Sequence, residues 1–152
     1  MRRTAILILV AALAGCTSSP PPSPPSPSGR AALGNAPQTV DEAFFQTPSG
    51  NVYCVLNRAL ARCDIIRRTW LPPAKPAGCD FDWGNGAYVE AGTAGMTCAS
   101  DTLIGSARQT LEYGESLRAG PLRCDSQSTG VTCSSVQTSH GFTLASAQYA
   151  LF

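Results

Sequence analysis

The one histidine of the chain, His140, is the residue best suited to acid–base chemistry, because imidazole changes its charge near neutral pH. A hydrolase would also need a nucleophile and an orienting acid, for which the sequence offers Ser49, Ser135, Ser139, Asp101 and Asp125. The chain has no Gly-x-Ser-x-Gly motif, the turn that presents the serine in many hydrolases. We therefore predict no catalytic residue and keep His140 only as a weak functional candidate.

Carboxylates and cysteines are the other residues able to bind or react. Asp80 with Asp82, and Glu112 with Glu115, are close in sequence, but a glycosidase needs carboxylates about 5–10 Å apart across a cleft. Asp80 is better explained as the cap of a helical turn near 80–83. A calcium loop would need alternating oxygen ligands over a dozen residues, and that pattern is absent. We expect no metal site and no cofactor.

Aromatic residues are the better indication of a binding surface, because rings beside carboxylates can bind sugars. The domain carries Trp70, Trp83, Tyr88 and Tyr113. We assign Trp83 to the core. Trp70 follows two arginines and precedes two prolines, a loop context in which an aromatic side chain is exposed, so it is a second weak functional candidate.

The N-terminus has the parts of a bacterial lipoprotein signal. Arg2 and Arg3 precede an apolar run at 5–14, and Leu-Ala-Gly-Cys at 13–16 ends that run with small residues and a cysteine. About ten apolar residues are too few to span a bilayer as a helix. We therefore expect residues 1–15 to be a lipoprotein signal peptide that is removed from the mature chain.

Cys16 would then be the first mature residue and the site of lipidation, with diacylglycerol on its thiol and palmitate-type acyl chains. Two or more acyl chains hold a protein stably on a membrane where one would not. The expected location is the outer side of the cell membrane, after export, with the membrane as partner. The alternative is an ordinary secretory peptide cut after Ala12 or Ala14, which leaves Cys16 free.

Residues 16–40 are expected to be the lipidated cysteine and a tether. Six of the nine residues from Pro20 to Ser28 are proline, which excludes both sheet pairing and helix and favours an extended spacer. Without Arg2 and Arg3, nine of the eleven basic side chains remain against ten acidic ones. This near-neutral charge argues against a nucleic-acid partner, which would require a basic surface.

Six further cysteines lie in the expected domain at 41–152: Cys54, Cys63, Cys79, Cys98, Cys124 and Cys133. An even number in a small exported domain indicates three disulfides. Neither the close spacing of a zinc knuckle nor a Cys-x-x-Cys redox motif is present. Of the fifteen pairings we favour the sequential one, because the first and third pairs each enclose eight residues and resemble staples across a hairpin.

The equal spacing of the 54–63 and 124–133 pairs also hints at an internal duplication. Asn-Val-Tyr-Cys at 51–54 answers Pro-Leu-Arg-Cys at 121–124, with only the cysteine identical. Because two stapled hairpins arise readily without duplication, we favour two independent hairpins.

The rest of the domain is typical of an all-β fold. Short runs rich in Val, Tyr, Thr and Phe alternate with turns that contain Gly or Pro. We predict strands at 43–46, 51–57, 61–66, 86–91, 95–99, 109–113, 120–125, 130–136, 141–145 and 148–151. The expected fold class is a small disulfide-stapled β-sandwich or partly open barrel.

The order of several fragments resembles a family of actinobacterial exported domains of unknown function, which are often lipoproteins. The fragments are Phe-Gln-Thr-Pro-Ser-Gly-Asn-Val-Tyr-Cys at 45–54, then 62–65, 70, 79–84, 98–102, 111–114, 130–133 and 140–142. The resemblance covers about 44–152 and implies a secreted disulfide domain; because the family carries no assigned activity, it adds no catalytic residue. Ser139 stands where the resemblance suggests glycine, which affects only the local turn.

Together these features predict a cell-envelope lipoprotein with a non-catalytic binding or interaction domain outside the membrane. Its ligand would be a glycan, a lipid or another envelope protein. The alternatives are a hydrolase of envelope polymers that uses His140, and a secreted-type protease inhibitor.

Overall fold

The computed structural model describes residues 36–152. The expected signal peptide at 1–15, the expected lipidation site Cys16 and the tether up to residue 35 lie outside the described residues. In the part of the chain that is described, no helix is long and apolar enough to cross a membrane.

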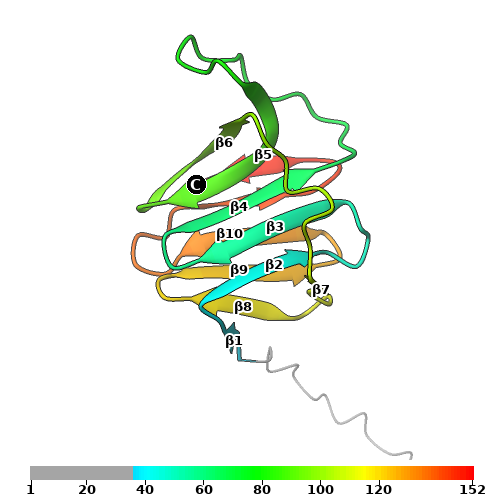
Figure 1. Cartoon of the computed structure of the whole chain (residues 1–152), viewed down its shortest axis with the longest axis vertical. Coiled ribbons are helices and arrows are strands. Elements are labelled where there is room, and N and C mark those ends of the chain that lie inside the picture. The colour runs from blue at the N-terminus through cyan, green and yellow to red at the C-terminus, as the bar shows by residue number, and fades with distance from the viewer. Residues whose placement is uncertain (1–35) are drawn as a thin grey trace, which may run out of the picture. The chain divides into compact units, whose positions relative to one another are not determined.

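The described residues form twelve strands and no helix. They are β1 (Gln38–Thr39), β2 (Glu42–Gln46), β3 (Val52–Asn57), β4 (Leu60–Ile65), β5 (Asp82–Glu90), β6 (Thr93–Ala99), β7 (Gln109–Thr110), β8 (Ser116–Ala119), β9 (Leu122–Gln127), β10 (Gly130–Ser135), β11 (Gly141–Leu144) and β12 (Tyr149–Leu151). Sheet 1 has the order β6-β5-β4-β3-β2-β7, and sheet 2 has the order β1-β8-β9-β10-β11-β12. In Figure 1 the two sheets overlap, with β3 and β4 lying over β9 and β10. The chain is therefore a β-sandwich, and the sheets are not closed into a barrel.

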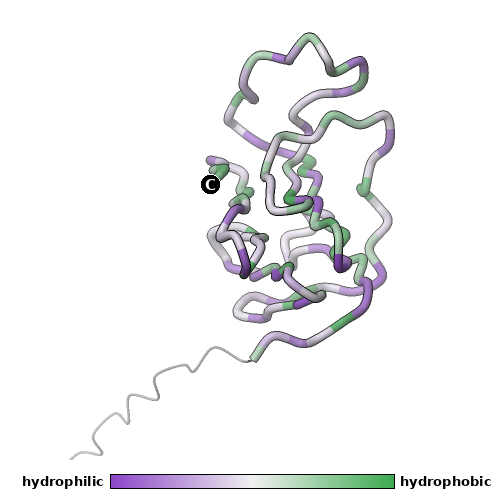
Figure 2. The backbone as a smooth tube through the Cα atoms, turned by 90° about the vertical axis from the view of Figure 1, so that its left-hand side faces the viewer, coloured by the Kyte–Doolittle hydropathy of each residue, from purple (hydrophilic) through white to green (hydrophobic). Residues whose placement is uncertain are grey.

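The core lies between the sheets because hydrophobic residues alternate along the strands, as they must when only one face of a sheet is buried. Figure 2 shows this alternation as changes of colour along the backbone. Phe45 of sheet 1 and Phe142 of sheet 2 are the largest fully buried side chains. We expect the burial of each of these two side chains to contribute about 1.5–3 kcal/mol of hydrophobic stabilisation.

Two disulfides lie in the centre of the core, one in each sheet. Cys54–Cys63 joins β3 to β4, and Cys124–Cys133 joins β9 to β10; in each pair the two residues are direct cross-strand partners with Cα atoms 4.1 Å apart. All four cysteines are fully buried, and the Sγ atoms of Cys63 and Cys133 are 3.9 Å apart, so the bridges contact one another across the sandwich. The third bridge is Cys79–Cys98. These are the three sequential pairs that the spacing favoured.

The topology shows that the two halves of the domain repeat one plan, which overturns our preference for independent hairpins. The first half (38–99) contributes the antiparallel series β2-β3-β4-β5-β6, and the second half (109–151) contributes β8-β9-β10-β11-β12. The short strand that opens each half joins the other half's sheet: β1 pairs in parallel with β8, and β7 pairs in parallel with β2. Both of these strands have the sequence Gln-Thr.

Matching glycines support this duplication. Gly86 is opposite Asp64, and Gly141 is opposite Ser134. Asp64 and Ser134 each directly follow the second cysteine of a core disulfide. At both positions a Cβ atom would overlap the carbonyl oxygen of that cysteine. The same steric requirement at equivalent places in the two halves is the signature of a repeated unit rather than of two unrelated hairpins.

Most predicted strands exist, with three differences. The strand predicted at 109–113 is only Gln109–Thr110, and β8 at Ser116–Ala119 was not predicted. The strand predicted at 120–125 begins at Leu122, because Gly120 has a φ of 57° and forms the turn between β8 and β9. Very short strands lack enough residues to show a period of two, which is why the pattern misses them.

The segment before the domain and the segment before Ala87 also differ from expectation. β1 lies within the range assigned to the tether, so the described fold begins before residue 41. The helical turn expected near 80–83 does not form; β5 begins at Asp82 and pairs with Ala99, with a bulge between Trp83 and Ala87. The bulge disrupts the alternation that would have revealed this part of the strand.

Candidate binding cleft

The two halves of the domain differ in the connections between their strands. The first half has a long connection from β4 to β5 at 66–81, where the second half has a short one at 136–140. Cys79–Cys98 fastens the long connection to β6 and has no counterpart in the second half. The connection from β6 to β7 at 100–108 then runs across the outer face of sheet 1, as Figure 1 shows. Residues 76–79 of the long connection and part of the 100–108 connection therefore lie beside the outer face of sheet 1.

The outer faces of the two sheets also differ in chemistry. Across the strands of sheet 1 the paired residues are Phe44, Val55, Arg62, Tyr88 and Gly95. The equivalent row of sheet 2 is Ser116, Asp125, Thr132, Thr143 and Ala150. Sheet 1 therefore carries large aromatic and apolar groups where sheet 2 carries small polar ones.

Arg62 fixes the 100–108 connection to the sheet. Its Nε and Nη2 donate to both carboxylate oxygens of Asp64, at 3.0 and 2.9 Å, and its Nη1 donates to Asp101 at 2.8 Å. The Asp64 side chain is only 3% exposed and also accepts a bond from the Leu103 N–H at 2.9 Å. The guanidinium is thus engaged by two carboxylates, and its role is to hold the connection in place.

These contacts shift the pKa values of the groups involved. Burial disfavours the charged form of Arg62, but the hydrogen bonds to Asp64 and Asp101 outweigh it and raise the pKa of Arg62. The hydrogen bond and the charge of Arg62 lower the pKa of the exposed Asp101 carboxyl. Both groups are therefore charged at neutral pH, and the ion pairs of Arg62 with Asp64 and Asp101, which we call the Arg62 clamp, are formed.

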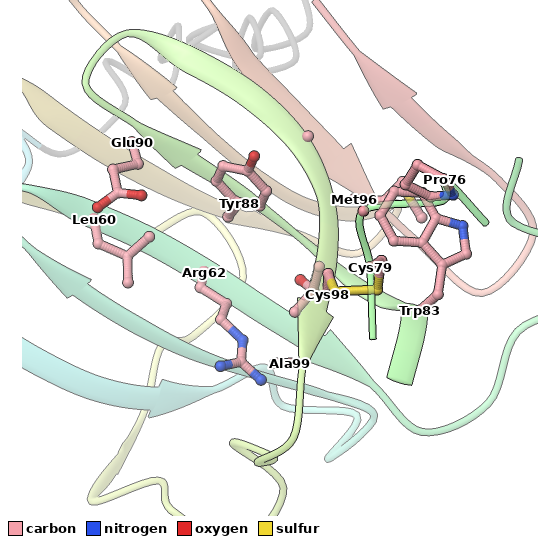
Figure 3. A pocket seen from close by; sticks show the side chains of 13 residues that line it. Leu60, Arg62, Pro76, Cys79, Trp83, Tyr88, Glu90, Met96, Cys98 and Ala99 are labelled. Atoms are coloured by element: carbon pink, nitrogen blue, oxygen red, sulfur yellow. A yellow bond between two sulfur atoms is a disulfide. The ribbon is translucent and has the colours of Figure 1, made fainter. Parts of the chain in front are cut away.

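Beside this clamp lies an open cleft of 480 Å³ along β6, which we call the binding cleft. Its lining comprises Leu60, Arg62, Pro76, Gly78, Cys79, Trp83, Tyr88, Glu90, Gly95, Met96, Thr97, Cys98 and Ala99. In Figure 3 the Trp83 ring and the disulfide lie at one end of the cleft, and Tyr88, Leu60 and Glu90 lie at the other. Clefts of this size, mainly apolar with a few polar groups, are typical of small-ligand sites.

Two aromatic rings of the cleft are held in fixed orientations. The Tyr88 side chain covers its cross-strand partner Gly95, where an added Cβ would come within 2.9–3.0 Å of the ring and hydroxyl. The Trp83 Nε1 donates to the carbonyl oxygen of Pro73 at 2.8 Å. Both rings are half-buried, so Trp83 is part of the cleft and not of the core, contrary to our assignment.

Two polar groups of the cleft have no partner within the described residues. The Glu90 side chain is exposed and forms no ion pair there. The Thr97 residue is 5% exposed, and its Oγ1 has no hydrogen-bond partner. Thr97 lines both the binding cleft and a neighbouring hollow of 460 Å³ on the other side of the Arg62 clamp. Unpaired polar groups of this kind can bind a polar ligand.

His140 lies apart from this cleft, in the turn between β10 and β11. It is exposed and lines a shallow hollow with Gly92, Thr93, Ala94, Leu151 and Phe152, none of which has an acidic side chain. The hydroxyl of Ser135 accepts bonds from two backbone N–H groups of the same turn. Ser139 has a φ of 62°, the left-handed conformation that glycine adopts most easily, in accord with the glycine that the resemblance suggests there.

The candidate acids and Trp70 have structural contacts. Asp101 pairs with Arg62, and Asp125 pairs with Arg123 on the outer face of sheet 2. The Trp70 Nε1 donates to the Ala145 carbonyl oxygen at 2.7 Å, and its ring lies 4.6 Å from that of Tyr149. Trp70 thus fastens the 66–81 connection to sheet 2. Within residues 36–152 no group of three or more His, Cys, Asp or Glu side chains could hold a metal ion.

Comparison with known families finds one match, over residues 28–152, to a family of unknown function (DUF6636). The chain belongs to this family. The match begins before the domain boundary expected at residue 41, in agreement with the position of β1. No curated protein and no solved structure matches the chain.

Sequence reasoning missed the central residues of the binding cleft. Tyr88 was noted only as an aromatic residue, and Glu90 and Thr97 were not noted at all. Gly95 is the signal that was available, because a glycine inside a strand often marks a place where another group approaches closely. The identity of that group, Tyr88, depends on the register of β5 with β6, which the two-residue turn between Glu90 and Thr93 sets.

Proposed function

We propose that this protein is a cell-envelope lipoprotein whose domain binds a ligand in the binding cleft without catalysing a reaction. The observation that carries the proposal is that the disulfide-fastened connection at 66–81, which the second half replaces with a short turn, contributes Pro76, Gly78 and Cys79 to this cleft. The second half forms its own sheet without a long connection or a third disulfide at the equivalent place. The location of this connection favours a function acquired at that place.

The proposed location rests on three sequence features and one structural feature. An exported, lipid-anchored protein is favoured by the signal at 1–15, by the lipid-attachment motif that ends at Cys16 and by the proline-rich tether. The three disulfides are compatible with an oxidising compartment. The tether would place the cleft some distance from the membrane surface, where envelope components are accessible.

Binding is favoured over hydrolysis by the position of the candidate catalytic groups. His140 lies in a different hollow from the binding cleft, and its neighbours there include no acidic side chain. Asp101, one of the acids that could orient it, is paired with Arg62. In the cleft itself, Glu90 and Arg62 are the charged side chains, and Arg62 is engaged by aspartates.

The anchor is tested by metabolic labelling with a radioactive fatty acid in a bacterial host that processes lipoproteins. The full chain is expected to take up label and to fractionate with membranes, and Cys16→Ser is expected to do neither. Unlabelled protein in both strains would contradict the anchor.

Binding is tested by co-sedimentation of the detergent-solubilised full chain with purified cell-envelope material. Tyr88→Leu should reduce the bound fraction at least tenfold, whereas Tyr113→Ala, at an exposed tyrosine outside the cleft, should not change it. His140→Ala should also leave binding intact. Equal binding by the Tyr88 and Tyr113 variants would refute a role for the cleft.

A further inference from the structure

We propose that the ligand of the binding cleft is an uncharged carbohydrate, whose ring stacks on Tyr88 and whose hydroxyl groups bond to Glu90 and Thr97. This inference rests on the proposed function and specifies its ligand. It is derived from the shape of the aromatic surface, the polar groups beside it and the net charge that the cleft presents.

The aromatic surface is suited to a sugar because it is flat and already ordered. The Tyr88 ring lies against Gly95, so little conformational entropy is lost when a ligand covers its other face. A pyranose ring has an apolar face of C–H groups that matches such a surface. The second ring, Trp83, lies at the other end of the cleft, an arrangement that suits an oligosaccharide spanning both rings (Figure 3).

The polar groups beside these rings match sugar hydroxyls. The Glu90 carboxylate is exposed, accepts hydrogen bonds only, and lies next to Tyr88 and Leu60 at one end of the cleft. The Thr97 hydroxyl both donates and accepts, and it has no partner in the protein. Thr97 lies four residues beyond Thr93, the partner of Glu90, on β6, so one sugar unit can donate to Glu90 while a hydroxyl of another unit exchanges a bond with Thr97, which would satisfy a buried group that is otherwise costly.

The charge of the cleft argues against anionic ligands such as phosphate groups. Arg62 is the one cation among the lining residues, and Asp64 and Asp101 already neutralise it. The free charge that remains is the carboxylate of Glu90, which repels anions. A cationic peptide is the competing ligand. Its binding would require the negative charge of Glu90, whereas a carbohydrate requires only that the Glu90 side chain accepts hydrogen bonds.

The experiment is isothermal titration calorimetry of the solubilised full chain against named probes. The neutral probes are the tetramers of β-1,4-linked N-acetylglucosamine, β-1,4-linked glucose and α-1,4-linked glucose; the cationic probe is hexalysine. We expect at least one neutral tetramer to bind, with an affinity that changes less than twofold between 50 and 500 mM salt.

Substitutions then separate the two ligand classes. Tyr88→Phe should retain sugar binding within about threefold, and Tyr88→Leu, which still covers Gly95 but lacks the flat ring, should weaken it at least tenfold. Glu90→Gln keeps an acceptor without the charge, so sugar binding should fall less than fivefold, whereas hexalysine binding would be lost. Circular dichroism of each variant establishes that it is folded.

The outcomes distinguish this inference from the proposed function. Binding of hexalysine but of no neutral tetramer, with a steep dependence on salt and on the Glu90 charge, would overturn the carbohydrate and leave the binding cleft. If no probe binds and Tyr88→Leu still reduces co-sedimentation with envelope material, the carbohydrate is again overturned. If Tyr88→Leu changes neither measurement, both proposals fail.

Discussion

The three disulfides should differ sharply in their reactivity toward a thiol reductant. The four cysteines of the core bridges are 0% exposed and lie between the sheets, whereas Cys98 is exposed and Cys79 is 6% exposed. A reductant such as dithiothreitol can therefore attack the Cys79–Cys98 bridge in the folded protein, but it reaches the core bridges only after the sheets separate.

The magnitudes follow from unfolding and loop closure. If the core bridges open only by global unfolding, their reduction is slowed by the unfolding equilibrium, a factor of about 10³–10⁸ for small domains. Loss of Cys79–Cys98, whose sequence separation is 19, costs about 3 kcal/mol at most in the chain-entropy model. For a domain of this size that lowers the melting temperature by roughly 10–15 °C.

The assay is a time course of reduction under native conditions, followed by alkylation and peptide mass mapping. Two thiols, at positions 79 and 98, should appear first, and the remaining four should appear only when denaturant is added. The double variant Cys79→Ser/Cys98→Ser should lack the fast phase and show the lower melting temperature. Simultaneous release of all thiols, or release from Cys54–Cys63 first, would refute the conclusion that the two core bridges are protected by packing.

Three further predictions concern stability. Gly86→Ala should destabilise the domain by about 3 kcal/mol in urea unfolding, because its Cβ would overlap a carbonyl oxygen of the neighbouring strand, whereas Gly78→Ala, with no atom within 4 Å of the new Cβ, should have little effect. Ser139→Gly should stabilise by about 0.5–1 kcal/mol, seen as a higher melting temperature, because relief of the left-handed backbone outweighs the added backbone entropy of glycine. Arg62 lowers the folded-state pKa of Asp101, so the ion pair between them stabilises the folded protein above the ordinary pKa of 3.8. This stabilisation is lost as the pH falls through the folded-state pKa of Asp101. Asp101→Asn should therefore destabilise the domain more at pH 7 than at pH 2; an equal effect at both values would contradict the clamp.

Some features of this fold could be predicted from local patterns, and others could not. The bridge between Cys54 and Cys63 follows from hairpin geometry, because two strands joined by a short turn place equally spaced residues opposite each other. The strands that carry these cysteines show a clear alternation of apolar residues. By contrast, β1 and β7 are too short for any period, and their partners lie in the other half of the chain.

The candidate site depends even more than the fold on contacts that local sequence patterns do not predict. His140 and Trp70 attracted attention as single residues, but the structure places them in a turn and in a packing contact. Tyr88 and Glu90 became candidates only once β5 was paired with β6 and the 66–81 connection was fastened beside them. A cleft is a property of several segments together, so no single segment indicates it.

The amino-acid sequence by itself determined the all-β class, the three sequential disulfides and the features that favour export, because each depends on spacing within a short stretch of chain. The tertiary structure decided the repetition of the two halves, the exchange of their first strands and the assembly of the binding cleft. These depend on contacts between residues far apart in the chain, such as Gln38 with Leu117 and Phe45 with Gln109. Such contacts form only when the two sheets bury their apolar faces against each other, which no local pattern specifies.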